Sequence, residues 1–106
     1  MSDFEICDLR VGEYKKVWVH PERPDMYCCD IDLGNGEIRT IGSGVASSYP
    51  IEKITGQCLV FYNLKPRTMK GFTSNGMVLF ASTEDHKTFE LIHPPKGSKP
   101  GDRLFI

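Results

Sequence analysis

Long hydrophobic segments are absent from this sequence: no uninterrupted apolar stretch exceeds five residues, the length of the run at residues 58–62. A membrane-spanning helix needs about twenty apolar residues, so we expect no transmembrane segment. The first residues, Met-Ser-Asp-Phe-Glu, have no basic start and no apolar run, and we expect no secretory signal. With 106 residues, 40% of them hydrophobic, the chain is predicted to form one domain, residues 1–106, without a disulfide or metal.

Metal-ligand spacing is also missing. The four cysteines, Cys7, Cys28, Cys29 and Cys58, form no CxxC pair, and the three histidines are scattered. Adjacent residues on a strand point to opposite faces, so Cys28 and Cys29 make a poor metal pair. We therefore expect no metal and no cofactor. Free thiols without a signal peptide indicate a reducing compartment, and hence a cytoplasmic protein.

Catalytic motifs are lacking as well. Residues 71–76 have the two glycines of a phosphate loop but no following lysine and no helical pattern. Ser43 lies between two glycines, which is not a nucleophile elbow. Asp30 and Asp32 share one face of a predicted strand, but such a face is more often solvated than catalytic. We therefore expect no enzyme activity in this chain.

What the sequence does contain is strand patterning. Residues 4–19 are rich in Val, Tyr, Trp and Phe, and Gly12 suggests a bulge in their middle. Two prolines predict a loop at residues 20–25. Residues 27–33 then alternate between apolar and polar side chains, as in a half-buried strand. Asn35-Gly36 follows, a strong hairpin signal, and leads into a returning strand at residues 37–42.

The second half adds one short helix and further strands. Ser48 is predicted to cap a helical turn at residues 50–54, closed by Gly56. Residues 58–62 read as a fully buried strand, and residues 63–76 as a polar connection. Further strands are expected at residues 78–81, 89–93 and 103–106. This order predicts an all-β fold, a five-stranded Greek-key OB-fold barrel with one short helix between strands 3 and 4. An SH3-like barrel is the alternative, but it explains the helix less well.

The net charge of −1 conceals an uneven distribution. Residues 1–52 hold 5 Lys and Arg against 10 Asp and Glu, whereas residues 53–106 hold 8 against 4. Residues 53–83 contain four basic residues and no acid. Such asymmetry indicates a basic face, although chance clustering gives the same counts.

The basic residues concentrate in residues 63–71, Asn-Leu-Lys-Pro-Arg-Thr-Met-Lys-Gly. Arg and Lys interleaved with Asn, Ser and Thr are the mixture that contacts phosphates and sugars. Pro66 stiffens the segment and lowers the entropic cost of presenting its charges. The flanking Tyr62 and Phe72 could stack on unpaired bases if exposed, but a core role is favoured for both.

Several motifs follow one another along the chain: residues 8–12, 20–21, 25–27, 39–41, 43–45, 63–71, 74, 76–77, 81–82, 94–95, 97 and 100–103. Together they resemble the tRNA-binding domain family, the module found in methionyl- and tyrosyl-tRNA synthetases and in the endothelial monocyte-activating polypeptide II group. Met26 stands where the family's HP-x-x-D-x-L-Y loop usually has Leu.

The resemblance implies an OB barrel that binds tRNA without sequence specificity and has no active site of its own. It implies partnership with an aminoacyl-tRNA synthetase, in cis or in trans. Bacterial members of this length usually act as dimers, which makes a homodimer one expected assembly. The resemblance ties the vertebrate cytokine activity to the segment after Leu9; here residues 10–12 are followed by Glu13-Tyr14, which departs from that pattern, so no cytokine activity is expected. The tRNA-binding residues carried over are Asn63, Lys65, Arg67, Met69, Lys70, Ser74 and Ser82, with Arg39 and Ser43 in second rank.

Two other functions remain open at this level. Related barrels act as export chaperones that dimerise, but these generally lack the full Asn-Leu-Lys-Pro-Arg stretch. A scaffold that binds a synthetase complex and touches RNA weakly is the other. Met69 and Ser82 also have structural interpretations, as a loop anchor and a strand-end hydrogen bond.

Overall fold

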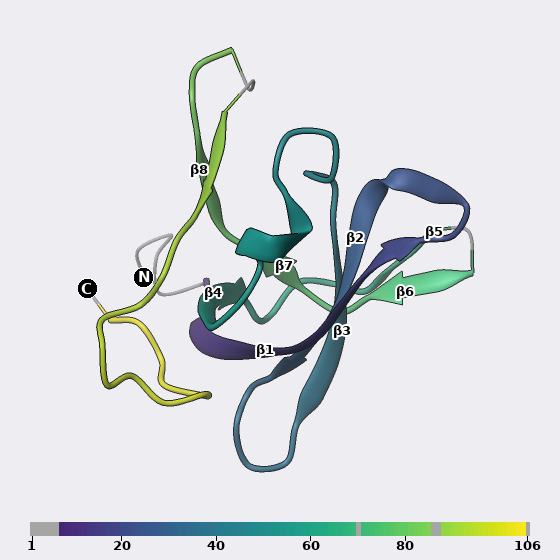
Figure 1. Ribbon diagram of the computed structural model, residues 1–106. Helices are drawn as coiled ribbons and strands as arrows, with labels where there is room; N and C mark the ends of the chain where they lie inside the picture. Colours follow the sequence, from purple (N-terminus) through teal and green to yellow (C-terminus); the bar gives the residue numbers. More distant parts are fainter. Residues whose placement is uncertain (1–6, 70, 86–87, 106) are drawn as a thin grey trace.

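A computed structural model describes residues 7–69, 71–85 and 88–105, and shows a curved five-stranded sheet with two small hairpins (Figure 1). The sheet has the strand order β3-β2-β1-β4-β7. Its strands are β1 (Leu9–His20), β2 (Arg23–Asp32), β3 (Ile38–Ser43), β4 (Gln57–Phe61) and β7 (Met77–Val78). The separate hairpins are β5 (Arg67–Met69) with β6 (Phe72–Ser74) and β8 (Phe80–Ser82) with β9 (Phe89–Leu91).

The sheet closes on itself between β3 and the segment that leads into β7. The amide of Asn75 donates to the carbonyl of Thr40 at 2.9 Å, and the amide of Gly42 donates to the Ser74 hydroxyl at 2.9 Å. These bonds satisfy the otherwise open edge of β3. The predicted all-β, five-stranded OB barrel is thereby confirmed.

The β2–β3 hairpin forms as its sequence predicts. Asn35 has φ 52° and Gly36 has φ 79°, and the amide of Glu37 donates to the carbonyl of Gly34 at 2.9 Å. Two successive positive φ angles suit the twist of a tight hairpin, and Asn-Gly tolerates both.

The short helix was predicted at the right place, but it is a 3₁₀ turn. A single 3₁₀ turn, η1 (Ile51–Lys53), lies between β3 and β4. Its N-cap is Pro50, without a side-chain cap hydrogen bond, so Ser48 does not cap it. With only three helical residues there is no periodic apolar face to bury, and no α-helix propagates.

The bulge in β1, the start of β2 and the last strand also differ from the predictions. Gly12 pairs regularly with Cys58, and the bulge in β1 lies instead between Tyr14 and Lys16. β2 begins at Arg23, within the predicted loop, because Pro24 falls where the pairing with β1 is interrupted and no amide is needed there. The predicted last strand is reduced to one bridging residue, Arg103, and its Ile106 lies outside the described residues.

The part predicted as a polar connection, residues 63–76, contains the β5–β6 hairpin. The predicted strand at residues 78–81 is divided between β7 and β8 at Leu79, whose amide donates to the carbonyl of Leu59. These strands are two or three residues long, too short for an alternating pattern to reveal.

The barrel core is built from the inward faces of β2, β3 and β4. Ile31, Ile41 and Val60 are completely buried, as the alternation and the apolar run predict. Cys28, expected on the outer face of β2, is buried too, so that face is covered at this point. Among the described residues, no helix is long and apolar enough to cross a membrane.

Candidate nucleic-acid interface

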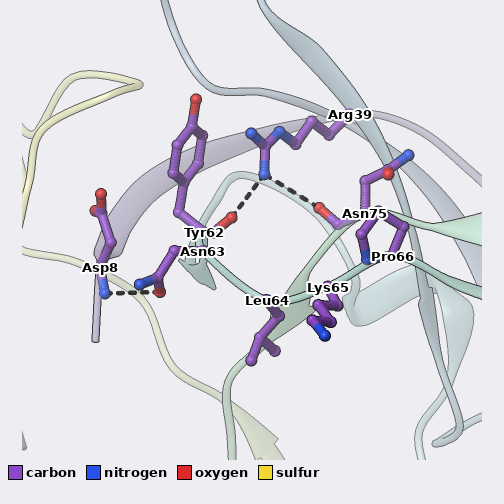
Figure 2. A pocket seen from close by; sticks show the side chains of 8 residues that line it. All are labelled: Asp8, Arg39, Tyr62, Asn63, Leu64, Lys65, Pro66 and Asn75. Carbon is purple, nitrogen blue, oxygen red and sulfur yellow. Dashed lines mark hydrogen bonds between the residues drawn. The ribbon is translucent and has the colours of Figure 1, made fainter. Parts of the chain in front are cut away.

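A surface hollow of about 500 Å³ opens where the chain leaves β4 (Figure 2). The loop of residues 63–66 forms one wall, and side chains from β3 and from the segments before β1 and β7 complete it. Because β4 is paired with β1 and β7, this loop emerges from a rigid part of the barrel. The hollow is lined by Asp8, Arg39, Tyr62, Asn63, Leu64, Lys65, Pro66 and Asn75.

A smaller hollow of about 110 Å³ shares Leu64 and Lys65 with the first and adds Arg67 from β5. The two hollows therefore adjoin at Leu64 and Lys65, and together they are called the groove below. Lys65 and Arg67 are both exposed, and within the described residues neither forms an ion pair. Their charges are available to an anionic ligand in the groove.

The two predicted serines on this side of the barrel are buried instead. The Ser74 hydroxyl accepts from the amide of Gly42 at 2.9 Å and donates to the carbonyl of Gly76 at 3.1 Å. Ser43 is 8% exposed at the end of β3. Ser74 lines the smaller hollow, but both hydrogen bonds of its hydroxyl help to close the barrel, a role that the sequence motif does not reveal.

The remaining predicted residues divide between the groove and other places. Asn63 lines the groove, and its side-chain oxygen accepts from the amide of Asp8 at 2.9 Å. Ser82 lies on the β8–β9 hairpin and lines neither hollow. Met69 pairs with Phe72 through its backbone, but its side chain and all of Lys70 lie outside the described residues.

Arg39 reaches the groove from β3 and is engaged on several sides. Its Nη1 donates to the carbonyl of Tyr62 at 2.7 Å, and its Nε donates to the Glu37 carboxylate at 2.9 Å. Figure 2 shows Nη1 directed at the carbonyls of Tyr62 and Asn75, and its distance to the Asn75 oxygen is 3.5 Å.

The ring of Tyr62 is held between two guanidinium groups. Arg39 lies 3.7 Å and Arg10 3.9 Å from the ring centroid. Two groups this close to one centroid must cover opposite faces, so Tyr62 offers no face for a base to stack on. Phe72 is half-buried and packs edge-on against His20, with the ring centroids 6.0 Å apart.

Two carboxylates offset the arginines. Arg10 donates two 2.9 Å bonds to Asp8 and lowers the pKa of that carboxyl. Hydrogen bonds from the Tyr62 hydroxyl, at 2.7 Å, and from Arg39 lower the pKa of Glu37. Both carboxyls are ionised at neutral pH, so this cluster is largely neutralised from within.

Sequence reasoning gave no role to Arg10, Glu37 or Asp8. Glu37 lies immediately before β3 and Arg39 lies within it, two residues later, so both side chains are on one face, and this spacing was the available signal. The contact of both arginines with Tyr62 joins β1 and β3 to the residue after β4 and had no local signal.

The described residues include no group of three metal-ligating side chains. Burial raises the pKa of the Cys29 and Cys58 thiols to about 12, so both are protonated and unreactive.

Comparison with known proteins identifies relatives over nearly the whole chain. The sequence profile described as "Putative tRNA binding domain" matches residues 9–103. The chain is 40% identical to the cytoplasmic tyrosine–tRNA ligase of Xenopus laevis over 98% of its own length and 20% of the ligase. It is 41% identical to the cytoplasmic methionine–tRNA ligase of Arabidopsis thaliana, over 92% of this chain and 12% of that one.

A third relative is the aminoacyl tRNA synthase complex-interacting multifunctional protein 1 of Cricetulus griseus, 36% identical over 96% of this chain and 28% of that protein. The chain thus spans between 12% and 28% of the length of these relatives.

Two solved structures have a similar fold. The MetRS related protein from Pyrococcus horikoshii superposes with a TM-score of 0.89 at 33% identity, covering 97% of this chain and 94% of that one. The CsaA chaperone protein from Picrophilus torridus does so with a TM-score of 0.83 at 26% identity, covering 97% and 95%.

Proposed function

This chain belongs to the tRNA-binding domain family, and we propose that it binds tRNA along the groove beside the 63–66 loop. The observation that carries the proposal is the pair of exposed cations Lys65 and Arg67, which line the groove and form no ion pair within the described residues. Lys70 and Met69 belong to the same proposed surface by their place in the sequence. Asn63 adds a polar wall. Ser74 lines the smaller hollow but is buried with its hydroxyl engaged, Ser43 is buried, and Ser82 lies on the β8–β9 hairpin, so all three are weaker candidates.

Recognition of this kind is largely independent of sequence. Lys and Arg side chains neutralise phosphates and release counterions from the nucleic acid. The groove offers no free aromatic face for reading bases, since both faces of Tyr62 are covered. Shape and charge of the tRNA backbone are therefore the proposed determinants of binding.

We propose that the chain, residues 1–106, is one accessory domain and acts with an aminoacyl-tRNA synthetase, in cis or in trans. The names of its relatives, two ligases and a complex-interacting protein, support this partnership. Such a domain raises the local concentration of tRNA at the synthetase and needs no catalysis of its own. A cytoplasmic location fits the two cytoplasmic ligases, and a homodimer would add avidity.

The test is tRNA binding measured across salt concentrations. Neutralising three to five phosphates gives a log–log salt slope of about −2 to −4. Replacing Lys65, Arg67 and Lys70 together by Ala should weaken binding and flatten the slope. The matched control replaces Lys15, Lys16 and Arg23, which line neither hollow, and removes the same charge. Equal loss in both triple variants would place the interface elsewhere.

A protein-binding module is the second candidate, favoured by the similarity to the CsaA chaperone. An apolar depression of about 320 Å³ supports it, with Phe80 and Phe89 half-buried and Met77 51% exposed at its rim. A wild-type chain that binds no tRNA at any salt concentration, but protects an unfolded protein from aggregation, would establish this function instead.

A further inference from the structure

We propose that Arg39 is a positioning residue of the tRNA-binding groove: it holds the start of the 63–66 loop in place and does not itself contact RNA. The proposal rests on the proposed function, because it concerns how the same groove is kept in shape. It reassigns a residue whose charge and position in the groove would otherwise suggest a phosphate contact.

The first step is the contact of Arg39 with Tyr62, which precedes the loop. Nη1 of Arg39 donates a 2.7 Å hydrogen bond to the carbonyl of Tyr62, the residue immediately before the loop. The guanidinium carbon, Cζ, also lies 3.7 Å from the centroid of the Tyr62 ring. Backbone and side chain of Tyr62 are thus both fixed by one group, and the orientation of the next residues follows from them.

The second step is the support of Arg39 itself. Glu37 binds Nε of Arg39 at 2.9 Å and accepts from the Tyr62 hydroxyl at 2.7 Å. Arg10 covers the other face of the ring and is held by Asp8. The Arg10–Tyr62–Arg39 stack is therefore braced by a carboxylate at each arginine.

The third step is the geometry that only arginine provides. A planar guanidinium can stack on a ring while donating along its edge in two directions. A lysine ammonium keeps the charge but has no plane to stack and no fork of donors. Arg39→Lys therefore separates the charge of the residue from its positioning role.

The fourth step concerns charge. The Arg39 side chain is 24% exposed and paired with Glu37. Lys65 and Arg67 are exposed on the same groove without such pairing in the described residues. The salt dependence of binding should thus come from these two cations and their neighbours in sequence, and Arg39 should add nothing to it.

The decisive variant is Glu37→Ala. Removing an acid beside the groove should tighten tRNA binding if charge alone matters. If Arg39 and Tyr62 need Glu37 to hold the loop, binding should instead weaken, by about threefold. Tighter or unchanged binding by E37A would overturn the proposal. Glu37 is at the surface, with 38% of its side chain exposed, so the fold should tolerate the change.

The second variant is Arg39→Lys, with Arg23→Lys as its control. Arg23 forms an ion pair with Asp25 at 3.2 Å outside the groove. We expect R39K to weaken tRNA binding about fivefold to tenfold with an unchanged salt slope. Binding is measured well below the melting temperature of the variant. The control R23K should bind tRNA as the wild type does. Wild-type affinity in R39K, or a salt slope reduced as in the triple variant of Lys65, Arg67 and Lys70, would show that Arg39 does not act by positioning.

Hydrogen exchange supplies a readout independent of RNA. The amide of Tyr62, which donates to the carbonyl of Asp8 at 2.7 Å, should exchange faster in R39K and E37A, while the amides of β1 and β2 keep their protection. Unchanged exchange at Tyr62 would count against the proposal. Failure of the proposed function looks different: the wild-type chain itself would then lack salt-dependent tRNA binding.

Discussion

At Gly12, neighbouring strands leave no space for a side chain. A Cβ atom at Gly12 would lie 2.5 Å from Cγ2 of Ile31 and 3.1 Å from Cγ2 of Val60, and both of those side chains are fully buried. We expect Gly12→Ala to destabilise the fold by about 1–3 kcal/mol, the usual cost of overpacking. Urea denaturation followed by Trp18 fluorescence measures this change.

The control for Gly12 is Gly44→Ala. A Cβ atom at Gly44 meets nothing within 4 Å, and its φ lies outside the left-handed region. We expect a change within about 0.5 kcal/mol there, as at an ordinary surface position. Equal effects at the two glycines would mean that steric crowding at Gly12 is not what matters. The sequence marks Gly12 as special but assigns it to a bulge, because crowding from two other strands has no local signature.

At the scale of elements, we expect Ser74, which helps to close the barrel, to contribute more to stability than Ser48, which was predicted to cap the helical turn. Ser74 is buried and joins the amide of Gly42 in β3 to the carbonyl of Gly76. Ser74→Ala leaves that amide without its acceptor, and we expect a loss of about 1–3 kcal/mol of stability. Ser48 is exposed and does not cap η1, so Ser48→Ala should change stability by less than about 0.5 kcal/mol.

Thermal or chemical unfolding of both serine variants tests this contrast. A larger loss in S48A than in S74A would contradict the closure described above. Elements with strong local chemistry, such as the Asn35-Gly36 hairpin and the apolar strand β4, were predictable from the sequence. The β5–β6 hairpin was not, because its three-residue strands pair only with each other and are too short to show an alternating pattern.

For the whole molecule, the carboxylates bracing the Arg10–Tyr62–Arg39 stack predict a loss of stability in acid. The pKa values of Asp8 and Glu37 are lowered from their ordinary values of 3.8 and 4.5. A lowered pKa means that the stabilisation is fully present above the ordinary value and is lost as pH falls through the lowered one. The melting temperature should therefore be nearly constant from neutral pH to about pH 5 and fall below about pH 4.5.

The double variant Asp8→Asn, Glu37→Gln isolates this contribution. We expect it to melt below the wild type at neutral pH, with a shallower decline between about pH 5 and pH 3, as measured by circular dichroism. An equally steep decline in the double variant would mean that other carboxyls account for the acid sensitivity.

The sequence by itself determined the all-β class, the β2–β3 hairpin, the family and the cations at Lys65 and Arg67, because each of these has a local pattern of residues. Only the tertiary structure decided which polar residues face the groove. It buried Ser74 in the closure of the barrel, and it covered both faces of Tyr62 with arginines from β1 and β3. The physical reason is that these contacts join strands distant in sequence, so that burial and stacking depend on strand pairing.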